Sequence, residues 1–516
     1  MNKRKILYIT LLAAGMLVAG SCSKSWLDVQ PKGSIPEEDY YKNADEAMNG
    51  LVAVYDVVGW QSSGFVTKVG ALNAASDDHY AGGGGPNDVS SLQVWSNYTL
   101  TPATGPQDVL WQKGFAGIAR ANTLLAKLPD VPMDENQKKR FAAEAKFLRA
   151  YFYFDLVRFF KAVPLMTDPI STLNEMYDVP QATPQEVYAQ IEQDLKDAIA
   201  EPNLPDQVPA ATEGGRATKG AAHALLGRVY LFEEKWADAV AELQEVNGAM
   251  PGQTSAKYGY KLLDNFGDLW SPAHKFNSES VFEINFNSSS AGNWDCVSCT
   301  EGNVLGVMVG PRGYRALTDQ APDYISGWSF LVITPDLFNA IHYDPRYRYT
   351  VANLDSLEDN GIVEYEKGFM NTGYFLEKFA GRTSTRSTGG GNWELNFGLD
   401  MYEIRLADTY LMEAEARVRS GESGLAGTRS YDLLNAVRAR VGLAPVSATI
   451  DNIMQERRLE LAGEGFRWFD LVRTGRASAV LGSRGFVAGK HEYLPIPLLE
   501  LDNTQIEQTT EWGGTK

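Results

Sequence analysis

Apolar residues recur at every third or fourth position through most of the first half of the chain, a spacing that predicts amphipathic helices. Within 137–160 they form one stripe that would face a core: Phe141, Ala145, Leu148, Phe152, Leu156 and Phe159. The same period predicts helices at 44–58, 109–128, 184–199, 218–233 and 235–246. We therefore expect a mainly α fold.

A stricter pattern occupies residues 218–251. Leu226 and Gly227 precede Tyr230, Ala239 follows nine residues after Tyr230, and Pro251 comes twelve residues later. These residue types and spacings match the 34-residue tetratricopeptide repeat. A single repeat cannot bury its apolar face alone, so further helix pairs should stack against it.

Two weaker helix pairs could supply that packing, namely 137–160 with 184–199 and 404–420 with 431–441. We expect tetratricopeptide-like repeats over about 44–251 and 401–475. Between them, at about 257–400, the helical period fades while Gly, Asn, Ser and aromatic residues become frequent. Short strand-like runs appear there at 280–285 and 373–379. Long irregular insertions on a regular frame are where binding functions tend to lie.

The N-terminus has the pattern of an export signal. Three cations at 3–5 precede a mostly apolar run at 6–19, which is followed by Gly20, Ser21 and Cys22. Small residues before a cysteine resemble a bacterial lipobox, so we expect 1–21 to be a lipoprotein signal peptide and Cys22 to be acylated. Several acyl chains, each contributing about 0.8 kcal/mol per buried CH₂, would anchor the chain to a membrane. Plain secretory cleavage is the alternative.

Charge excludes one class of function. The composition is that of a globular protein, with 44% apolar and 22% charged residues, and the formal net charge is −18. Loss of the three leader cations makes it −21. An acidic surface repels phosphate backbones, and the sequence has no long basic run, so we expect no nucleic-acid partner.

Catalytic and metal motifs are scarce. The five histidines are scattered, and the sequence contains no His-Glu-x-x-His pair, no Gly-x-Ser-x-Gly elbow and no EF-hand loop. The glycine run 82–85 lacks the Lys-Ser/Thr ending of a phosphate loop and indicates a flexible connection. We expect a non-enzymatic protein without metal or cofactor. A glycosidase, however, needs only two suitably spaced carboxylates, so a glycoside hydrolase stays open as an alternative.

Cys296 and Cys299 form an isolated Cys-x-x-Cys motif. A zinc site would need a second pair, and a thioredoxin-like redox motif would need a surrounding βαβ pattern. In an exported protein the spacing favours a small disulfide that stiffens a loop.

Several segments together resemble the SusD/RagB family of surface nutrient-binding lipoproteins. They occur in order along nearly the whole chain after Cys22: 26–33 (WLDVQPKG), 143–151 (AEAKFLRAY) with 163–165 (VPL), 218–230, 405–416 (RLADTYLMEAEA), and 456–461 (ERRLEL) with 465–473 (GFRWFDLVR).

The resemblance implies a tetratricopeptide-like frame that carries a loop-rich region, all within one SusD-like domain over 22–516. It also implies a lipid-anchored protein on the outer membrane, facing the cell exterior, that binds oligosaccharides or other nutrients without catalysis. The implied partner is a SusC-type TonB-dependent transporter to which the ligand is delivered. A repeat-based protein-interaction scaffold on the outer membrane is the alternative that the helical repeats alone would support.

A sugar site needs flat apolar faces for the rings and polar groups for the hydroxyls. Loops rich in both suggest these ligand-binding residues: Trp294, Trp95, Asp78, Tyr80, Trp328, Tyr324 and Arg312. A third, weaker cluster comprises Arg382, Arg386 and Trp393. Core packing is the alternative for Trp95, and also for Trp328 and Tyr324, because an apolar run begins at Phe330.

Overall fold

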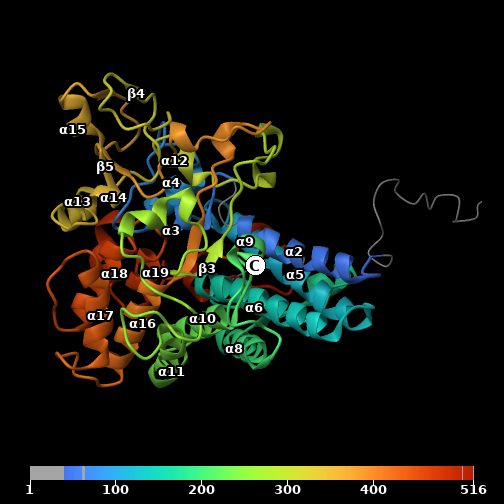
Figure 1. Cartoon of the computed structure of the whole chain (residues 1–516). Helices are drawn as coiled ribbons and strands as arrows, with labels where there is room; N and C mark the ends of the chain where they lie inside the picture. Colours follow the sequence, from blue (N-terminus) through green and yellow to red (C-terminus); the bar gives the residue numbers. More distant parts are fainter. Residues whose placement is uncertain (1–39, 61–63, 503, 515–516) are drawn as a thin grey trace, which may run out of the picture.

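The computed structural model describes residues 40–60, 64–502 and 504–514. The expected signal peptide and Cys22 lie outside these residues, so both stay predictions. Figure 1 shows the helices of the first half and the C-terminal helices α16–α19 side by side, with a loop-rich part at the upper left that carries β4, β5 and α13–α15. The expected mainly α fold with an irregular insertion is confirmed.

Each helix that the apolar periodicity predicts before the insertion is present, and short helices that it did not predict occur between them. Before the insertion they are α2 (Ala44–Gly59), α3 (Lys68–Ala75), α4 (Ser90–Ser96), α5 (Gln107–Lys127), α6 (Glu135–Phe160), α7 (Leu173–Asp178), α8 (Pro184–Ala200), α9 (Ala210–Glu213), α10 (Lys219–Phe232) and α11 (Trp236–Asn247). After it they are α16 (Leu406–Arg419), α17 (Arg429–Arg440), α18 (Ile450–Glu460), α19 (Arg467–Arg473), α20 (Ala477–Leu481) and α21 (Leu498–Leu501).

Side-chain caps fix where these helices begin. The Asp134 side chain accepts a hydrogen bond from the Gln137 N–H at the start of α6. Thr183 and Glu186 form a complete capping box at the start of α8. Such caps satisfy backbone N–H groups that have no partner inside the helix, and each contributes about 1 kcal/mol.

The repeat at 218–251 is a packed pair of helices, α10 and α11. A Cβ atom at Gly227 would lie 2.6 Å from Leu243, so only glycine permits this close crossing. Ala239 on α11 is fully buried. Helices α6 and α8 pack on one side of the pair and α16 and α17 continue on the other, so the repeat is embedded in a larger helical stack.

The insertion contains short helices and strands joined by long loops. Its helices are α12 (Leu305–Met308), α13 (Pro335–Ile341), α14 (Tyr347–Thr350) and α15 (Leu354–Asp359). Its strands form two-stranded antiparallel pairs: β3 (Ser280–Ile284) with β8 (Met401–Arg405), which follows the insertion directly, β4 (Arg315–Ala316) with β6 (Val363–Glu364), and β5 (Val351–Asn353) with β7 (Tyr374–Leu376). A further pair, β1 (Val163–Pro164) with β2 (Gln181–Ala182), lies outside the insertion, between α6 and α8.

A buried ion-pair network ties the insertion to the C-terminal helices. Arg405 at the end of β8 bonds Glu460 (2.6 Å), Glu464 (2.8 Å) and Glu279 (3.1 Å). Burial opposes the charge on Glu460, but its arginine partners outweigh that effect and hold its pKa well below the ordinary value. The buried ion-pair network comprises these residues: Glu279, Asp344, Arg346, Lys378, Arg405, Arg440, Glu456, Glu460 and Glu464.

Candidate ligand-binding site

Three aromatic side chains from separate segments meet on the surface of the insertion. The ring centroid of Trp328 lies 5.8 Å from that of Trp294 and 5.8 Å from that of Phe65, with interplanar angles of 40° and 45°. Trp294 and Phe65 are each 43% exposed, and Trp328 is half-buried between them. We call Phe65, Trp328 and Trp294 the aromatic platform.

Two hydrogen bonds hold the backbone of Trp328 in place. The backbone N–H of Trp328 donates to the Val307 carbonyl at 2.9 Å, and the backbone carbonyl of Trp328 accepts from Arg312 Nη2 at 3.1 Å. The Arg312 guanidinium also lies 3.6 Å from Asp88, and about a third of its side chain is exposed. Arg312, one of the predicted site residues, therefore positions Trp328 and can still offer N–H donors to a ligand.

The first two residues of the glycine run at 82–85 are packed against the Trp328 segment, which differs from the flexible connection expected for the run from its sequence. Gly82 and Gly83 are buried, and the Gly83 N–H donates to the Ser329 carbonyl at 2.7 Å. A Cβ atom at Gly82, whose φ is +69°, would lie only 2.3 Å from the Ser329 oxygen. Glycine is needed here because the loop backbone lies directly against the segment that carries Trp328.

Trp294 begins a short 3₁₀ helix, Trp294–Cys299, whose N-cap is Asn293. The Trp294 N–H donates to Asn392 Oδ1 at 3.3 Å, which ties this loop to the segment before Trp393. Cys296 is disulfide-bonded. The side chain of its expected partner, Cys299, lies outside the described residues, so the pairing stays a prediction.

Trp95 does not belong to this surface. It is fully buried, with its ring centroid 5.3 Å from both Tyr98 and Trp468. Its prediction as a ligand-binding residue is wrong, because α19 covers the indole and makes it part of the core.

Asp78 is likewise a structural residue rather than a ligand contact. It is 1% exposed and pairs with Arg458, whose Nε lies 2.8 Å from Asp78 Oδ1. Burial, followed by repulsion from Asp77, raises the pKa of Asp78. Asp77 makes a two-point pair with Arg467, which outweighs the effect of burial and lowers its pKa. Both carboxylates fasten the loop after α3 to the C-terminal helices.

The two predicted tyrosines lie beside a second hydrophobic cluster in the insertion. Tyr324 is 8% exposed and donates its hydroxyl to Glu377, so the prediction that it contacts a ligand is wrong in this structure. Tyr80 is half-buried beneath the Arg484 guanidinium, which lies 5.4 Å from its ring. Tyr80 keeps a partly exposed edge, and its role in binding stays a prediction.

The weaker third cluster is split by the fold. Arg382 is engaged by Asp323, at 2.8 Å, and by Glu377. The Arg386 guanidinium lies 4.3 Å above the ring of Trp393, and it is exposed. Asn392, which directly precedes Trp393, bonds the backbone of Trp294, but none of the three residues adds a ring to the platform.

Phe65 was missed from the sequence, although a signal for it exists. It directly follows a polar stretch that ends in glycine, 61–64, and precedes α3. A lone aromatic residue among small polar neighbours is the same feature that singled out Trp294, because such neighbours offer it little core to pack into.

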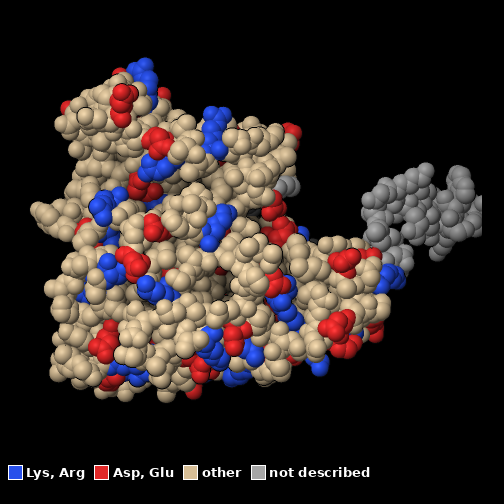
Figure 2. All heavy atoms as spheres, viewed as in Figure 1, with Lys and Arg blue, Asp and Glu red and all other residues tan. Residues whose placement is uncertain are grey.

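The side chains of the platform provide ring faces and hydrogen-bond donors. Among the described residues, no group of three or more His, Cys, Asp and Glu side chains is placed to hold a metal ion. The face shown in Figure 2 carries acidic and basic side chains interspersed over its whole extent.

No helix in the described part of the chain is long and apolar enough to cross a membrane. Exposed rings beside an arginine suit an uncharged, ring-containing ligand.

Helical repeats with an irregular insertion that exposes aromatic rings define a class of repeat-based binding proteins. The chain belongs to the SusD family. The family model described as "SusD family" matches residues 355–494, and one described as "Starch-binding associating with outer membrane" matches residues 25–231.

Similar proteins cover nearly the whole chain. A solved laminarin binding SusD-like protein is 51% identical with a TM-score of 0.87, over 91% of this chain and 99% of that chain. Surface glycan-binding protein A from Bacteroides fluxus is 26% identical with a TM-score of 0.79, over 90% and 99%. SusD-like protein P38 from Formosa agariphila is 26% identical over 98% of both chains.

Proposed function

We propose that this protein is a lipid-anchored receptor on the outer membrane that binds oligosaccharides on the aromatic platform and delivers them to a SusC-type TonB-dependent transporter. The ligand class that we propose is laminarin, a β-1,3-linked glucan. The solved relative at 51% identity, described as laminarin binding, supports this choice of ligand. The platform geometry supports it independently.

The observation that carries the proposal is the tilt of the three rings. Sugar rings stack their C–H faces on aromatic faces, so a rigid set of rings selects the relative orientation of successive sugars. Phe65, Trp328 and Trp294 are inclined to one another by 45° and 40°. A β-1,3-linked chain turns from residue to residue and can lay a face on each ring, whereas a flat β-1,4-linked ribbon cannot follow the tilt.

Polar groups beside the rings suit an uncharged glycan. Arg312 presents N–H donors and Asp88 presents carboxylate oxygens, and both side chains are between a third and two fifths exposed. Hydroxyl groups of a sugar both donate and accept hydrogen bonds, so they can use both partners at once. Because the two charges lie 3.6 Å apart and offset each other, the site favours neither anionic nor cationic sugars.

Calorimetry with laminarihexaose, cellohexaose and maltohexaose tests the ligand class. We expect laminarihexaose to bind, cellohexaose to bind at least tenfold more weakly, and the double variant Trp294→Ala/Trp328→Ala to lose binding. Equal affinity of the double variant and the wild type would remove the platform from the proposal. Prolonged incubation with laminarihexaose should release no new reducing ends; their release would support the hydrolase alternative.

Anchoring and delivery need separate tests in cells. We expect the wild-type protein to fractionate with membranes and to incorporate labelled fatty acid, and the Cys22→Ser variant to do neither. Purification from detergent-solubilised native membranes should recover a TonB-dependent barrel as the main partner. Recovery of a different, soluble protein in its place would favour the interaction-scaffold alternative.

A further inference from the structure

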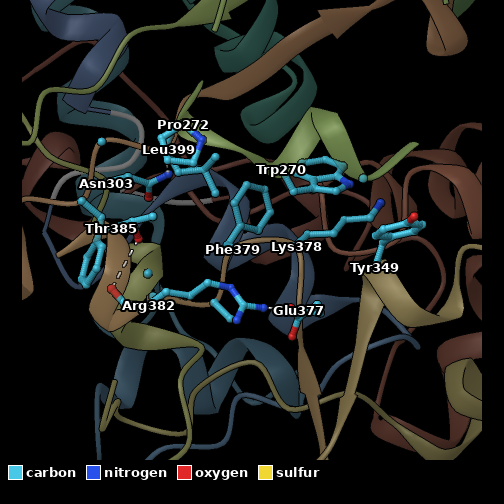
Figure 3. Close-up of a pocket in the computed structure, with 16 residues that line it drawn as sticks. Trp270, Pro272, Asn303, Tyr349, Glu377, Lys378, Phe379, Arg382, Thr385 and Leu399 are labelled. Carbon is cyan, nitrogen blue, oxygen red and sulfur yellow. Dashed lines mark hydrogen bonds and ion pairs between the residues drawn. The ribbon is translucent and has the colours of Figure 1, made fainter. Parts of the chain in front are cut away.

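Two hollows in the described part of the chain differ in character. The walls of a cavity of about 190 Å³ in the insertion combine charges with rings: Figure 3 shows Glu377, Lys378 and Arg382 beside Trp270 and Phe379. A groove of about 580 Å³ along α5, which we call the α5 groove, is lined mainly by apolar side chains. A large apolar hollow at the surface marks a place where another chain segment binds.

The apolar wall of the α5 groove comes from three separate parts of the chain. It includes Phe115 and Ile118 of α5, Met166, Ile170 and Met176 of the segment 163–179, and Ile506 near the C-terminus. Ile170 is 37% exposed and Met176 is 49% exposed. Large apolar side chains are therefore gathered in one open groove instead of being scattered singly over the surface.

The charge of the groove indicates what kind of segment it suits. Among the described residues that line it, only Asp168 and Glu500 are charged, and both are acidic. An apolar segment flanked by positive charge would match both properties of the groove.

The chain itself contains such a segment. Residues 26–29, Trp-Leu-Asp-Val, combine three large apolar side chains within four positions, and Lys24 and Lys32 lie on either side of them. They belong to the stretch 23–39, which connects the expected lipidation site to the described part of the chain and which we call the N-terminal segment. No other part of the N-terminal segment has two adjacent large apolar residues.

The direction of α2 brings the N-terminal segment to the groove. Helices α2 and α5 pack against each other and run antiparallel. Arg120 Nη1 donates to the Ala53 carbonyl at 2.6 Å, and Lys113 Nζ donates to the Trp60 carbonyl. Because residue numbers fall along α5 as they rise along α2, the start of α2 lies toward the C-terminal end of α5.

The N-terminal segment is long enough to reach the groove. Along the helix axes, the start of α2 lies about 14 Å from Ala53, and Thr123, which lines the groove, lies about 5 Å from Arg120 in the same direction. The remaining gap along the axis is about 9 Å, whereas residues 30–39 span up to about 33 Å when extended. The groove follows α5 over 111–123, about 18 Å, which accommodates an extended four-residue segment of about 13 Å.

We propose that residues 26–29 dock in the α5 groove, with Trp26, Leu27 and Val29 against its apolar wall. This contact goes beyond the proposed function, and only its consequence rests on the proposed acylation of Cys22. With residues 26–29 docked, the three residues 23–25 separate the lipid from the protein surface by about 10 Å. The whole N-terminal segment, left free, would span up to about 56 Å. Docking therefore holds α5 close to the membrane and limits the orientations of the helical frame.

Labelling of an introduced cysteine tests whether residues 26–29 occupy the groove. Ala119 lines the groove and is exposed in the described part of the chain. In membrane fragments from cells that make the full-length chain, Ala119→Cys should react slowly with a maleimide, and adding Trp26→Ala/Leu27→Ala should speed the reaction about fivefold. Val52→Cys on α2, where the native side chain is 50% exposed, is the matched control and should react equally fast in both chains.

Each outcome of the labelling decides the proposal. Fast labelling of Ala119→Cys with the native N-terminal segment would show an open groove and overturn it. Slow labelling that persists after Trp26→Ala/Leu27→Ala would assign the groove to a second copy or to another protein, and would overturn it as well. Laminarihexaose affinity should be the same with and without Trp26→Ala/Leu27→Ala, so failure of docking and failure of the platform are told apart.

Cross-linking provides a second measurement. Under mild oxidation, Leu27→Cys should form a disulfide with Ala119→Cys about tenfold faster than with Val52→Cys, because docking raises the effective concentration of residue 27 at the groove. The cross-link is identified by mass spectrometry of the joined peptides. Equal rates for the two pairs would show that the N-terminal segment is not held in the groove, and would overturn the proposal.

Discussion

The segment 77–98, which includes α4, and the aromatic platform have similar compositions but opposite environments. Both combine tryptophan with polar and glycine residues, yet Trp95 is fully buried and Trp294 is 43% exposed. The difference lies in what packs against each segment. The C-terminal helices α18 and α19 supply Arg458, Arg467 and Trp468 to the first loop. The platform segments are held by α12 and by the glycine run at 82–85, and they leave Trp294 and Phe65 partly exposed.

The comparison teaches that an aromatic residue in a stretch of polar and glycine residues is not for that reason a binding residue. Its environment depends on elements far away in sequence, and here Arg458 lies 380 residues after Asp78. The four predictions below test whether the two regions are as different as the structure indicates.

The largest effect should come from removing the buried tryptophan. Trp95→Ala should lower the free energy of unfolding by about 3–5 kcal/mol, because it leaves a cavity between Tyr98 and Trp468. Glycan affinity of the folded fraction should not change. The matched variant Trp294→Ala should lower the free energy of unfolding by only about 1 kcal/mol, since the side chain is 43% exposed and its removal leaves no enclosed cavity. Similar losses of stability in the two variants would erase the distinction.

Acid should lower the free energy of unfolding through a buried histidine in the segment 77–98. His79 is fully buried, with Nδ1 2.8 Å from the Leu331 carbonyl, and burial lowers its pKa to about 4. In the unfolded chain His79 binds a proton near pH 6.5, whereas in the folded protein it does so only near pH 4. The contribution of neutral, buried His79 to the free energy of unfolding is therefore fully present above pH 6.5 and is lost as the pH falls toward 4. The loss from this group is about 3 kcal/mol.

Urea unfolding at several pH values measures that loss. His79→Gln should show a flatter decline of stability between pH 6.5 and 4 than the wild type, even if its stability at pH 7 is lower. The same substitution at the exposed His274 is the matched control. An identical acid slope in wild type and His79→Gln would place the acid sensitivity elsewhere.

Truncation at the centre of the platform should reduce binding. Trp328→Ala should weaken laminarihexaose binding about 30-fold, or about 2 kcal/mol, because Trp328 contacts both other rings and occupies the middle of the surface. Trp328→Phe should recover part of the affinity. Calorimetry measures the affinity, and circular dichroism confirms that each variant is folded; full affinity in Trp328→Ala would exclude the platform as the binding surface.

Phe65 should have the smallest effect of the four. Phe65→Ala should lower laminarihexaose affinity about threefold, because the ring stands at one end of the platform and contacts only Trp328 among its rings. Leu425→Ala, at another exposed apolar residue, is the control and should leave affinity unchanged. Equal effects at Phe65 and Leu425 would shorten the platform to two rings.

Most of the helical frame was predictable because helix periodicity is a local signal. The predicted ranges 44–58, 137–160 and 218–233 correspond to α2, α6 and α10 within two residues at each end. The repeat at 218–251 was recognisable because Gly227 and Ala239 are dictated by the close crossing of one helix pair.

The site was predictable only in part. The structure brings Trp294 and Trp328 together, as a shared binding surface requires, and places Arg312 beside them. Trp95 and Asp78 were misassigned because the local sequence around a residue does not reveal which distant helices will cover it. Phe65 was missed because its segment lies far from the insertion in sequence, and only the folded chain places it next to Trp328.

The buried ion-pair network determines which exchanges between relatives should preserve the fold. Glu279, Arg346 and Lys378 lie within the insertion, while Glu460 and Glu464 lie in the C-terminal part. Removing one partner of a buried pair costs about 3–5 kcal/mol, so a chimera that replaces the whole insertion must carry matching charges. Grafts confined to the outer loops avoid that requirement. New ligand preferences can thus arise by exchanging loop tips while the charged interior of the scaffold is inherited intact.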